Sequence, residues 1–201
     1  MKKKVFGVVL MILAVSVLLG GFCAGREQQA LADKLIRLHV VANSDSEADQ
    51  AIKLQVRDAV LDETQQLLDG AADPRKALAD NLDRIEAAAN RALAAAGSAD
   101  HAAASLGEEM FPTREYETFS LPAGAYTALR VTIGAGEGHN WWCVVFPSLC
   151  MSASMEEMEA AAQAAGLTEG EIKLITEESE GYVLKFKTME WLQRLKEFFE
   201  D

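Results

Sequence analysis

The chain begins with a long apolar segment that has no polar face. Lys2, Lys3 and Lys4 form a basic cluster, and an uncharged run from Val5 to Phe22 follows them. A basic start before an apolar core is typical of a secretory signal, and the run is also long enough to span a bilayer, which takes roughly 20 apolar residues. We therefore expect residues 1–25 to be a cleaved signal peptide or a retained membrane anchor helix. Both would place the rest of the chain outside the cytoplasmic membrane, because the lysines stay in the cytoplasm.

After this segment the pattern predicts one strand and two helices. Apolar and polar positions alternate over residues 34–42, which is the period of a half-buried strand. A capping-box spacing between Ser46 and Asp49 then opens a helix that should end near residue 69. An aspartate followed by proline opens a second, alanine-rich helix over residues 73–97.

The second half of the chain is dominated by strand patterns. Short alternating segments separated by glycine and proline predict strands over residues 101–106, 114–120, 126–133 and 140–146. A third helix is expected over 154–165, strands over 172–175 and 181–187, and a closing amphipathic helix over 188–199. This order predicts an α+β fold, with helices packed on a mostly antiparallel sheet, for a single domain at residues 26–201.

The net charge of the chain disfavours some classes of binding partner. There are 31 acidic and 19 basic residues, which gives a formal net charge of −12. An acidic protein is repelled by nucleic acids and by anionic lipid surfaces. We therefore expect no nucleic acid partner, and contact with the membrane only through the N-terminal segment.

Two of the three cysteines lie outside the N-terminal segment. Cys143 and Cys150 form an even pair in a domain that we expect to be exported, and disulfides persist in such compartments. A bridge requires the chain to reverse between them, which Phe146-Pro147-Ser148 could allow. The alternative is two buried free thiols that pack as small apolar groups.

Few residues have the spacing of a catalytic or metal site. His39 with Asp45 or Asp49 could move protons or bind a metal, but this spacing matches no ligand pattern such as H-E-x-x-H. The glycine run at residues 134–138 lies between strands rather than before a helix, so we expect a hairpin or an exposed loop and not a phosphate site. A G-x-S-x-G nucleophile motif is absent. The sequence therefore predicts no metal, no cofactor and no small-molecule substrate.

The string Asn140-Trp141-Trp142-Cys143 is the most unusual local feature. In an alternating strand the two tryptophans lie on opposite faces, so at least one of them should be buried. Core packing explains this arrangement. The functional alternative is that an exposed tryptophan anchors a protein partner, because tryptophan is enriched in binding hot spots.

Two blocks of residues together resemble a known family. The first block contains residues 37–46 (RLHVVANSDS) and residues 49–58 (DQAIKLQVRD). The second contains FPTR at 111–114, LPAG at 121–124, YTALRV at 126–131 and GHNWWCVVFPSLC at 138–150. Over residues 35–150 the chain resembles the stage II sporulation protein R family.

This resemblance implies a signalling function. Members of the family are exported by the forespore into the space between forespore and mother cell. There they activate a membrane-embedded aspartic protease that processes the precursor of the sigma E factor. The resemblance therefore implies a secreted, non-enzymatic protease activator in sigma factor activation. The rival hypothesis is an exported hydrolase or metal-dependent enzyme that uses His39 with Asp45 or Asp49.

The family supplies no contact residues that can be carried over to this chain. The candidates for partner binding are polar and aromatic residues that gather in the two blocks. We predict this surface at Arg37, His39, Asn43, Ser44, Asp45, Arg57, Asp58, Asn140, Trp141 and Trp142.

Overall fold

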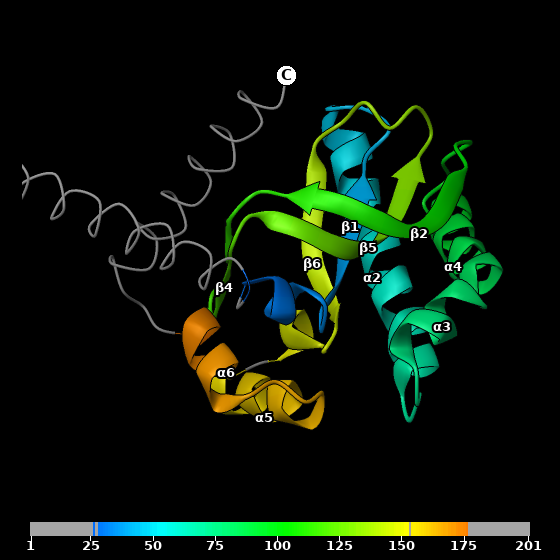
Figure 1. Cartoon of the computed structure of the whole chain (residues 1–201). Helices are drawn as coiled ribbons and strands as arrows, with labels where there is room; N and C mark the ends of the chain where they lie inside the picture. Colours follow the sequence, from blue (N-terminus) through cyan, green and yellow to red (C-terminus); the bar gives the residue numbers. More distant parts are fainter. Residues whose placement is uncertain (1–25, 27, 153, 177–201) are drawn as a thin grey trace, which may run out of the picture.

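Four strands form one mixed sheet in the order β2-β5-β1-β6 (Figure 1). The strands are β1 (Ile36–Val41), β2 (Ala102–Phe111), β5 (Gly124–Ile133) and β6 (Asn140–Phe146). The central pair, β1 and β5, is parallel, and the two outer pairings are antiparallel. The α+β class is confirmed, and the sheet that was predicted to be mostly antiparallel is mixed, with one parallel pairing at its centre. Alternation along a strand gives its faces and not the direction of its neighbours.

The structure is a computed structural model that describes residues 26, 28–152 and 154–176. The apolar run at 5–22, the predicted strand at 181–187 and the predicted helix at 188–199 lie outside these residues. Among the helices that are described, none combines the length and hydropathy needed to cross a bilayer.

Three helices follow β1 and cover one face of the sheet. They are α2 (Glu47–Leu68), α3 (Pro74–Ala79) and α4 (Leu82–Ala95). The predicted caps are confirmed: the side chains of Ser46 and Asp73 accept hydrogen bonds from Asp49 N and Lys76 N. The single helix predicted over 73–97 is wrong, because the chain breaks it between α3 and α4. The first core lies beneath α2 and α4 and contains Leu38, Val40, Val56, Val60, Ile85, Leu93, Leu129, Val131 and Val145.

A second core lies on the other face, toward one end of the sheet. Figure 1 shows α5 (Met155–Ala164) and α6 (Glu169–Thr176) at this end. A helical turn at residues 28–32 and a short 3-10 helix, Leu149–Met151, also belong to this region. The single strand predicted over 114–120 is instead a small antiparallel pair, β3 (Arg114–Glu115) with β4 (Ser120–Leu121). The second core contains Leu31, Leu35, Phe111, Leu121, Tyr126, Val144, Leu149, Met158, Ile172 and Ile175.

The strand predicted over residues 172–175 is wrong, because this segment is part of α6. Thr168 and Glu171 form a reciprocal cap: Glu171 N donates to Thr168 Oγ1 at 3.2 Å, and Thr168 N donates to Glu171 Oε2 at 2.7 Å. These bonds satisfy donors that a helix start otherwise leaves without a partner. The T-x-x-E capping motif at residues 168–171 therefore favours a helix, rather than a strand, for the short apolar run at residues 172–175.

The loop from β5 to β6 passes over the end of β1. The two strands lie on either side of β1, so the segment is not a hairpin and the other predicted alternative, an exposed loop, is confirmed. This loop has to cross from β5 to β6 over β1. Gly134 and Gly136 adopt positive φ angles of 55° and 65°, which glycine reaches without a steric penalty. At Gly138 a Cβ atom would collide with the carbonyl group of Ser44. The glycine run thus allows the loop to lie directly against the turn that follows β1.

Cys143 and Cys150 form a disulfide, with their Cα atoms 6.0 Å apart. The chain reverses after β6 at Phe146-Pro147, a cis peptide bond, and the 3-10 helix then returns toward the strand. The bridge joins β6, in the first core, to a segment that borders both cores.

Candidate functional site

His39 is the centre of a polar group that crosses all four strands of the sheet. Its Nδ1 lies 2.7 Å from Glu109 Oε2 on β2, and its Nε2 lies 2.8 Å from Asn140 Oδ1 on β6. Arg130 on β5 donates from Nη1 to the other carboxylate oxygen of Glu109 at 3.2 Å. Each strand therefore contributes one side chain to a continuous network.

Trp142 covers the ring of His39. The two ring centroids are 5.7 Å apart, and the planes are inclined by 20°. The guanidinium carbon of Arg114 lies 3.8 Å from the centroid of Trp142, a cation–π contact. We call the surface made by His39, Glu109, Arg130, Asn140 and Trp142 the network face. Asn140 is exposed and the Arg130 side chain is 41% exposed, so this face is open to solvent at its margins.

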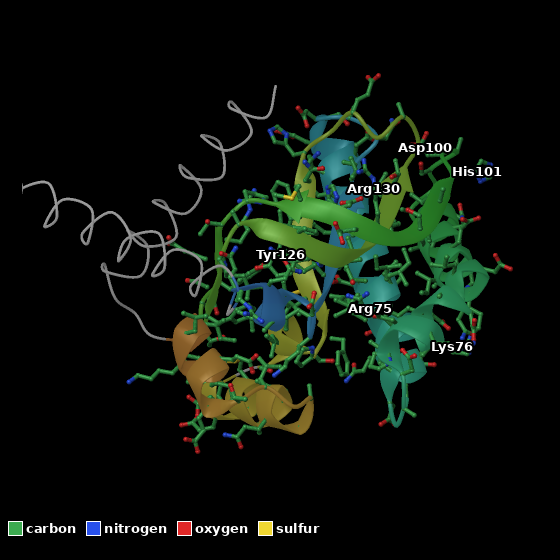
Figure 2. The ribbon with its side chains drawn as sticks, viewed as in Figure 1. Arg75, Lys76, Asp100, His101, Tyr126 and Arg130 are labelled. Atoms are coloured by element: carbon green, nitrogen blue, oxygen red, sulfur yellow. A yellow bond between two sulfur atoms is a disulfide. The ribbon has the colours of Figure 1, made fainter. Side chains whose placement is uncertain are left out.

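Arg37 lies on the same side of the sheet but is fully buried. Its guanidinium carbon is 4.1 Å from the ring centroid of Phe111 and 4.9 Å from that of Tyr126, and Nη2 donates to Tyr116 Oη at 2.9 Å. Burial lowers the pKa of Arg37, and burial also raises the pKa of Tyr126. Figure 2 shows Tyr126 near the start of β5 and Arg130 nearer its end. Arg37 is therefore placed to support the network face from within the second core.

The turn after β1 holds the β5–β6 loop through Asn43 and Asp45, and Ser44 between them bonds to α2. Asn43 Oδ1 accepts a hydrogen bond from Ala135 N at 2.9 Å, and Asp45 Oδ1 accepts one from His139 N at 2.6 Å. Ser44 Oγ donates to Asp49 Oδ2 at 2.5 Å and Asn43 Nδ2 donates to the same oxygen at 3.1 Å. The bond from Ser44 is the largest cause that lowers the pKa of Asp49. The polar side chains of this turn are thus engaged in local structure.

Lys53, on α2, is a buried cation. It is only 5% exposed, and its Nζ donates to His139 O at 2.9 Å and to Gln50 Oε1 at 2.6 Å. Burial is the main cause that lowers its pKa. Lys53 ties α2 to the start of β6, beside the network face.

The remaining predicted residues form a separate patch on the side of α2. Trp141 lies opposite Val40, so it faces the first core, whereas Trp142 lies opposite His39. The guanidinium carbon of Arg57 is 4.4 Å from the centroid of Trp141, and Arg57 Nε donates to Asp58 Oδ1 at 2.8 Å. The predicted site is therefore divided between two faces of the sheet.

The structure does not bring His39 together with Asp45 or Asp49. The hydrogen bonds of His39 go to Glu109 and Asn140, while Asp45 contacts His139 and Asp49 contacts Ser44. Asp49 also belongs to α2, which packs on the opposite face of the sheet. Among residues 26, 28–152 and 154–176, no three His, Cys, Asp or Glu side chains are arranged to hold a metal ion.

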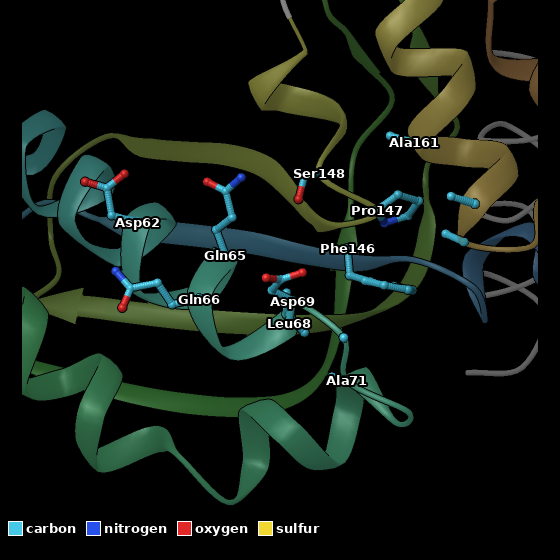
Figure 3. Close-up of a pocket in the computed structure, with 13 residues that line it drawn as sticks. Asp62, Gln65, Gln66, Leu68, Asp69, Ala71, Phe146, Pro147, Ser148 and Ala161 are labelled. Atoms are coloured by element: carbon cyan, nitrogen blue, oxygen red, sulfur yellow. The ribbon is translucent and has the colours of Figure 1, made fainter.

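A groove of about 850 Å³ lies between the end of α2, the Phe146-Pro147 turn and α5 (Figure 3). Its polar lining consists mainly of carboxylates and amides at the end of α2, and its apolar lining consists of Leu68, Phe146, Pro147 and alanines. None of the described residues that line it is a histidine, a cysteine or an arginine. Among the described lining residues, the titratable side chains are therefore the carboxylates of Asp62 and Asp69 alone.

The fold and the site together define an α+β domain whose distinctive surface is a polar and aromatic sheet face. Residues 32–156 match the profile of a family described as stage II sporulation protein R (spore_II_R). The chain is also 31% identical over 222 residues to the stage II sporulation protein R of Bacillus subtilis (strain 168), covering 97% of this chain and 99% of that protein. The chain belongs to the stage II sporulation protein R family and is thus a sporulation protein. No solved structure matches it.

Proposed function

We propose that this protein is an exported, non-catalytic signal that activates a membrane-embedded aspartic protease, which in turn processes the sigma E factor precursor. It would act between forespore and mother cell, after residues 1–25 direct it across the membrane. Membership in the stage II sporulation protein R family is the observation that carries this proposal. The basic and apolar start of the chain supports the export step.

The network face supplies a surface for the protease. His39 is held between two hydrogen-bonding partners and under Trp142, so little side-chain freedom remains to be lost on binding. Arg130 is paired with Glu109 there, and Arg114 beside Trp142 adds a further positive charge, within a chain of net charge −12. A complementary loop of the protease would carry carboxylates and aromatic or apolar side chains. Activation follows if this surface binds the active arrangement of the protease more tightly than the inactive one.

The direct test is reconstitution with the full chain. Cells that make no other sporulation protein would receive the protease, the sigma E precursor and this protein with its own leader, and precursor cleavage would be followed by immunoblot. We expect cleavage only when all three are present. Normal export of folded protein without any cleavage would reject direct activation.

Two tryptophan variants locate the contact surface. Trp142→Ala removes an aromatic group from the network face, and we expect it to lower the cleavage rate at least about 10-fold, the effect of losing a binding hot spot. Trp141→Ala is the matched control, because its ring lies on the α2 side beside Arg57. Arg130→Gln provides a second variant in case Trp142→Ala unfolds. Wild-type cleavage by both Trp142→Ala and Arg130→Gln would exclude the network face.

A further inference from the structure

β2 is an outer strand of the sheet, and α4 covers the start of its free edge (Figure 1). The backbone of Ala102 exchanges two hydrogen bonds with the side chain of Asn90, and Ala104 N donates to Glu86 Oε2 at 3.1 Å. Both side chains belong to α4. This helix therefore satisfies the backbone groups at the beginning of the edge.

The rest of this edge presents backbone groups that are unpaired within the described part of the chain. His101 O accepts a hydrogen bond from Gly134 N, so His101 faces β5 and the residue after it faces away. This direction alternates along an antiparallel strand, and the pairing with β5 is unbroken along the whole of β2. The N–H and C=O groups of Leu106, Glu108 and Met110 therefore point away from the sheet, and no described residue bonds to them.

The side chains beside these groups are open to solvent. Met110 is 63% exposed, an unusual position for a large apolar side chain. Glu108 is exposed and forms no ion pair within the described residues. A Cβ atom built on Gly107 would meet no atom within 4 Å, so the space beside it is empty. An edge of this kind is a template for pairing with another strand.

We propose that residues 106–110 of β2 bind an extended, basic segment of a partner protein as an added antiparallel strand. The matching segment carries a lysine or arginine opposite Glu108, an apolar side chain opposite Met110 and an aromatic side chain opposite Gly107. Opposite charges across a strand pair are stabilising, and an aromatic ring compensates for a glycine at a sheet edge. The inference goes beyond the proposed function, because it concerns how the domain recognises a strand and its test uses no protease.

A second copy of this chain fits the edge less well than a basic segment does. Pairing β2 with β2 of another copy would bring the two Glu108 carboxylates near one another, and like charges on paired strands are destabilising. The net charge of −12 on each chain opposes the association further. A basic segment instead supplies the charge that this edge lacks.

The added strand would lie beside the network face. Glu109 lies between Glu108 and Met110 in the sequence, but its side chain is on the other side of β2, where it contacts His39 and Arg130. Side chains alternate in the same way along the added strand. The side chains opposite Gly107 and Glu109 would therefore extend the network face, so a partner could contact both surfaces with one continuous segment.

Two synthetic peptides test the charge preference. One is acetyl-Val-Thr-Lys-Tyr-Val-Thr-amide, which has the matching residues in antiparallel order, and the other has glutamate in place of its lysine. Each is titrated into the full chain in zwitterionic detergent micelles, and Kd is taken from the NMR amide shifts of residues 106–110. We expect the lysine peptide to bind about 3- to 10-fold more tightly because of the cross-strand ion pair. Equal affinities, or no binding of either peptide at millimolar concentration, would overturn the proposal.

A charge reversal tests whether the contact lies at Glu108. In Glu108→Lys the preference should reverse, so that the glutamate peptide binds more tightly than the lysine peptide. Glu137→Lys changes the net charge by the same amount, but it lies on the β5–β6 loop at the other end of the sheet, and it should keep the wild-type preference. Reversal in both variants, or in neither, would contradict a contact at this edge.

Amide exchange tests the strand pairing itself. In the full chain without peptide we expect fast exchange at Leu106, Glu108 and Met110, and slow exchange at Gly107 and Glu109, which face β5. The lysine peptide at about ten times its Kd should slow the first three amides about 10-fold.

The control for this experiment is the lysine peptide methylated at every backbone nitrogen, which should give no protection because it cannot pair as a strand. Slow exchange at the three amides before peptide is added would show that the edge is already covered, by this chain or by a second copy. That result, or binding of the lysine peptide without protection, would overturn the proposal.

Discussion

The side chain of Asn90 joins α4 to the edge of the sheet by hydrogen bonds. Its removal tests how much these bonds contribute to the free energy of unfolding. Its Nδ2 donates to Ala102 O at 2.9 Å, and its Oδ1 accepts from Ala102 N at 3.0 Å. Ala102 is only 4% exposed. In Asn90→Ala both backbone groups of Ala102 would lose their partner in a buried position.

The magnitude follows from the number of groups left without a partner. Each buried unsatisfied group costs about 1–3 kcal/mol, and partial entry of water would reduce the total. We therefore expect Asn90→Ala to lower the free energy of unfolding by about 2–4 kcal/mol. Asn90→Asp keeps an acceptor for Ala102 N but loses the donor to Ala102 O, so its effect should be intermediate.

Urea unfolding of the full chain, followed by circular dichroism, measures this change. The midpoint should fall while the slope with urea stays constant, because the surface exposed on unfolding is nearly the same. Asn81→Ala is the matched control: its side chain makes one bond, from Nδ2 to Ala77 O at 2.8 Å, and we expect a loss of about 1 kcal/mol. If Asn90→Ala lowers the free energy of unfolding no more than Asn81→Ala does, then the bonds from Asn90 to Ala102 do not stabilise the contact between α4 and β2 as expected.

Two further predictions concern acid stability and the disulfide. The pKa of Asp49 is lowered chiefly by the hydrogen bond from Ser44, so its stabilisation is present above the unfolded pKa of about 3.9 and is lost as the pH falls through the folded pKa. Asp49→Asn should therefore weaken the dependence of unfolding free energy on pH below about pH 4, and an unchanged pH profile would contradict this. Cys143→Ser should lower the free energy of unfolding, measured with urea in the absence of reductant, by about 2.5 kcal/mol on the loop-entropy relation. The wild type with its disulfide reduced should have the same stability as this variant. A decrease of less than about 1 kcal/mol would argue against a closed bridge.

Local signals predicted the first half of the fold well. Ser46 and Asp73 cap helices where their spacing indicates, and α2 ends just before Gly70, which has a positive φ of 68°. The break between α3 and α4 was missed because Leu78 and Leu82 continue an apolar stripe across it. The α6 cap at Thr168 was also missed, although it has the same spacing as the cap at Ser46.

The site depends on pairings that local patterns do not contain. His39 meets Glu109 and Asn140 only because β2, β5, β1 and β6 are ordered in this way. The sequence indicated His39, Asn140 and Trp142 as candidates, but it gave no reason to join them to Glu109 or Arg130. The alternation rule did predict that Trp141 and Trp142 face opposite sides, and the register confirms it.

The position of β1 has a consequence for the order of assembly. This strand is made first, yet Ile36 finds its neighbours at Thr127 and Phe146, far later in the chain. Contacts between distant segments form slowly because a long loop must close first. β1 therefore has no strand to pair with until β5 and β6, and so most of the domain, have been synthesised. Such a delay would fit the export step proposed above, in which the chain crosses a membrane before it folds.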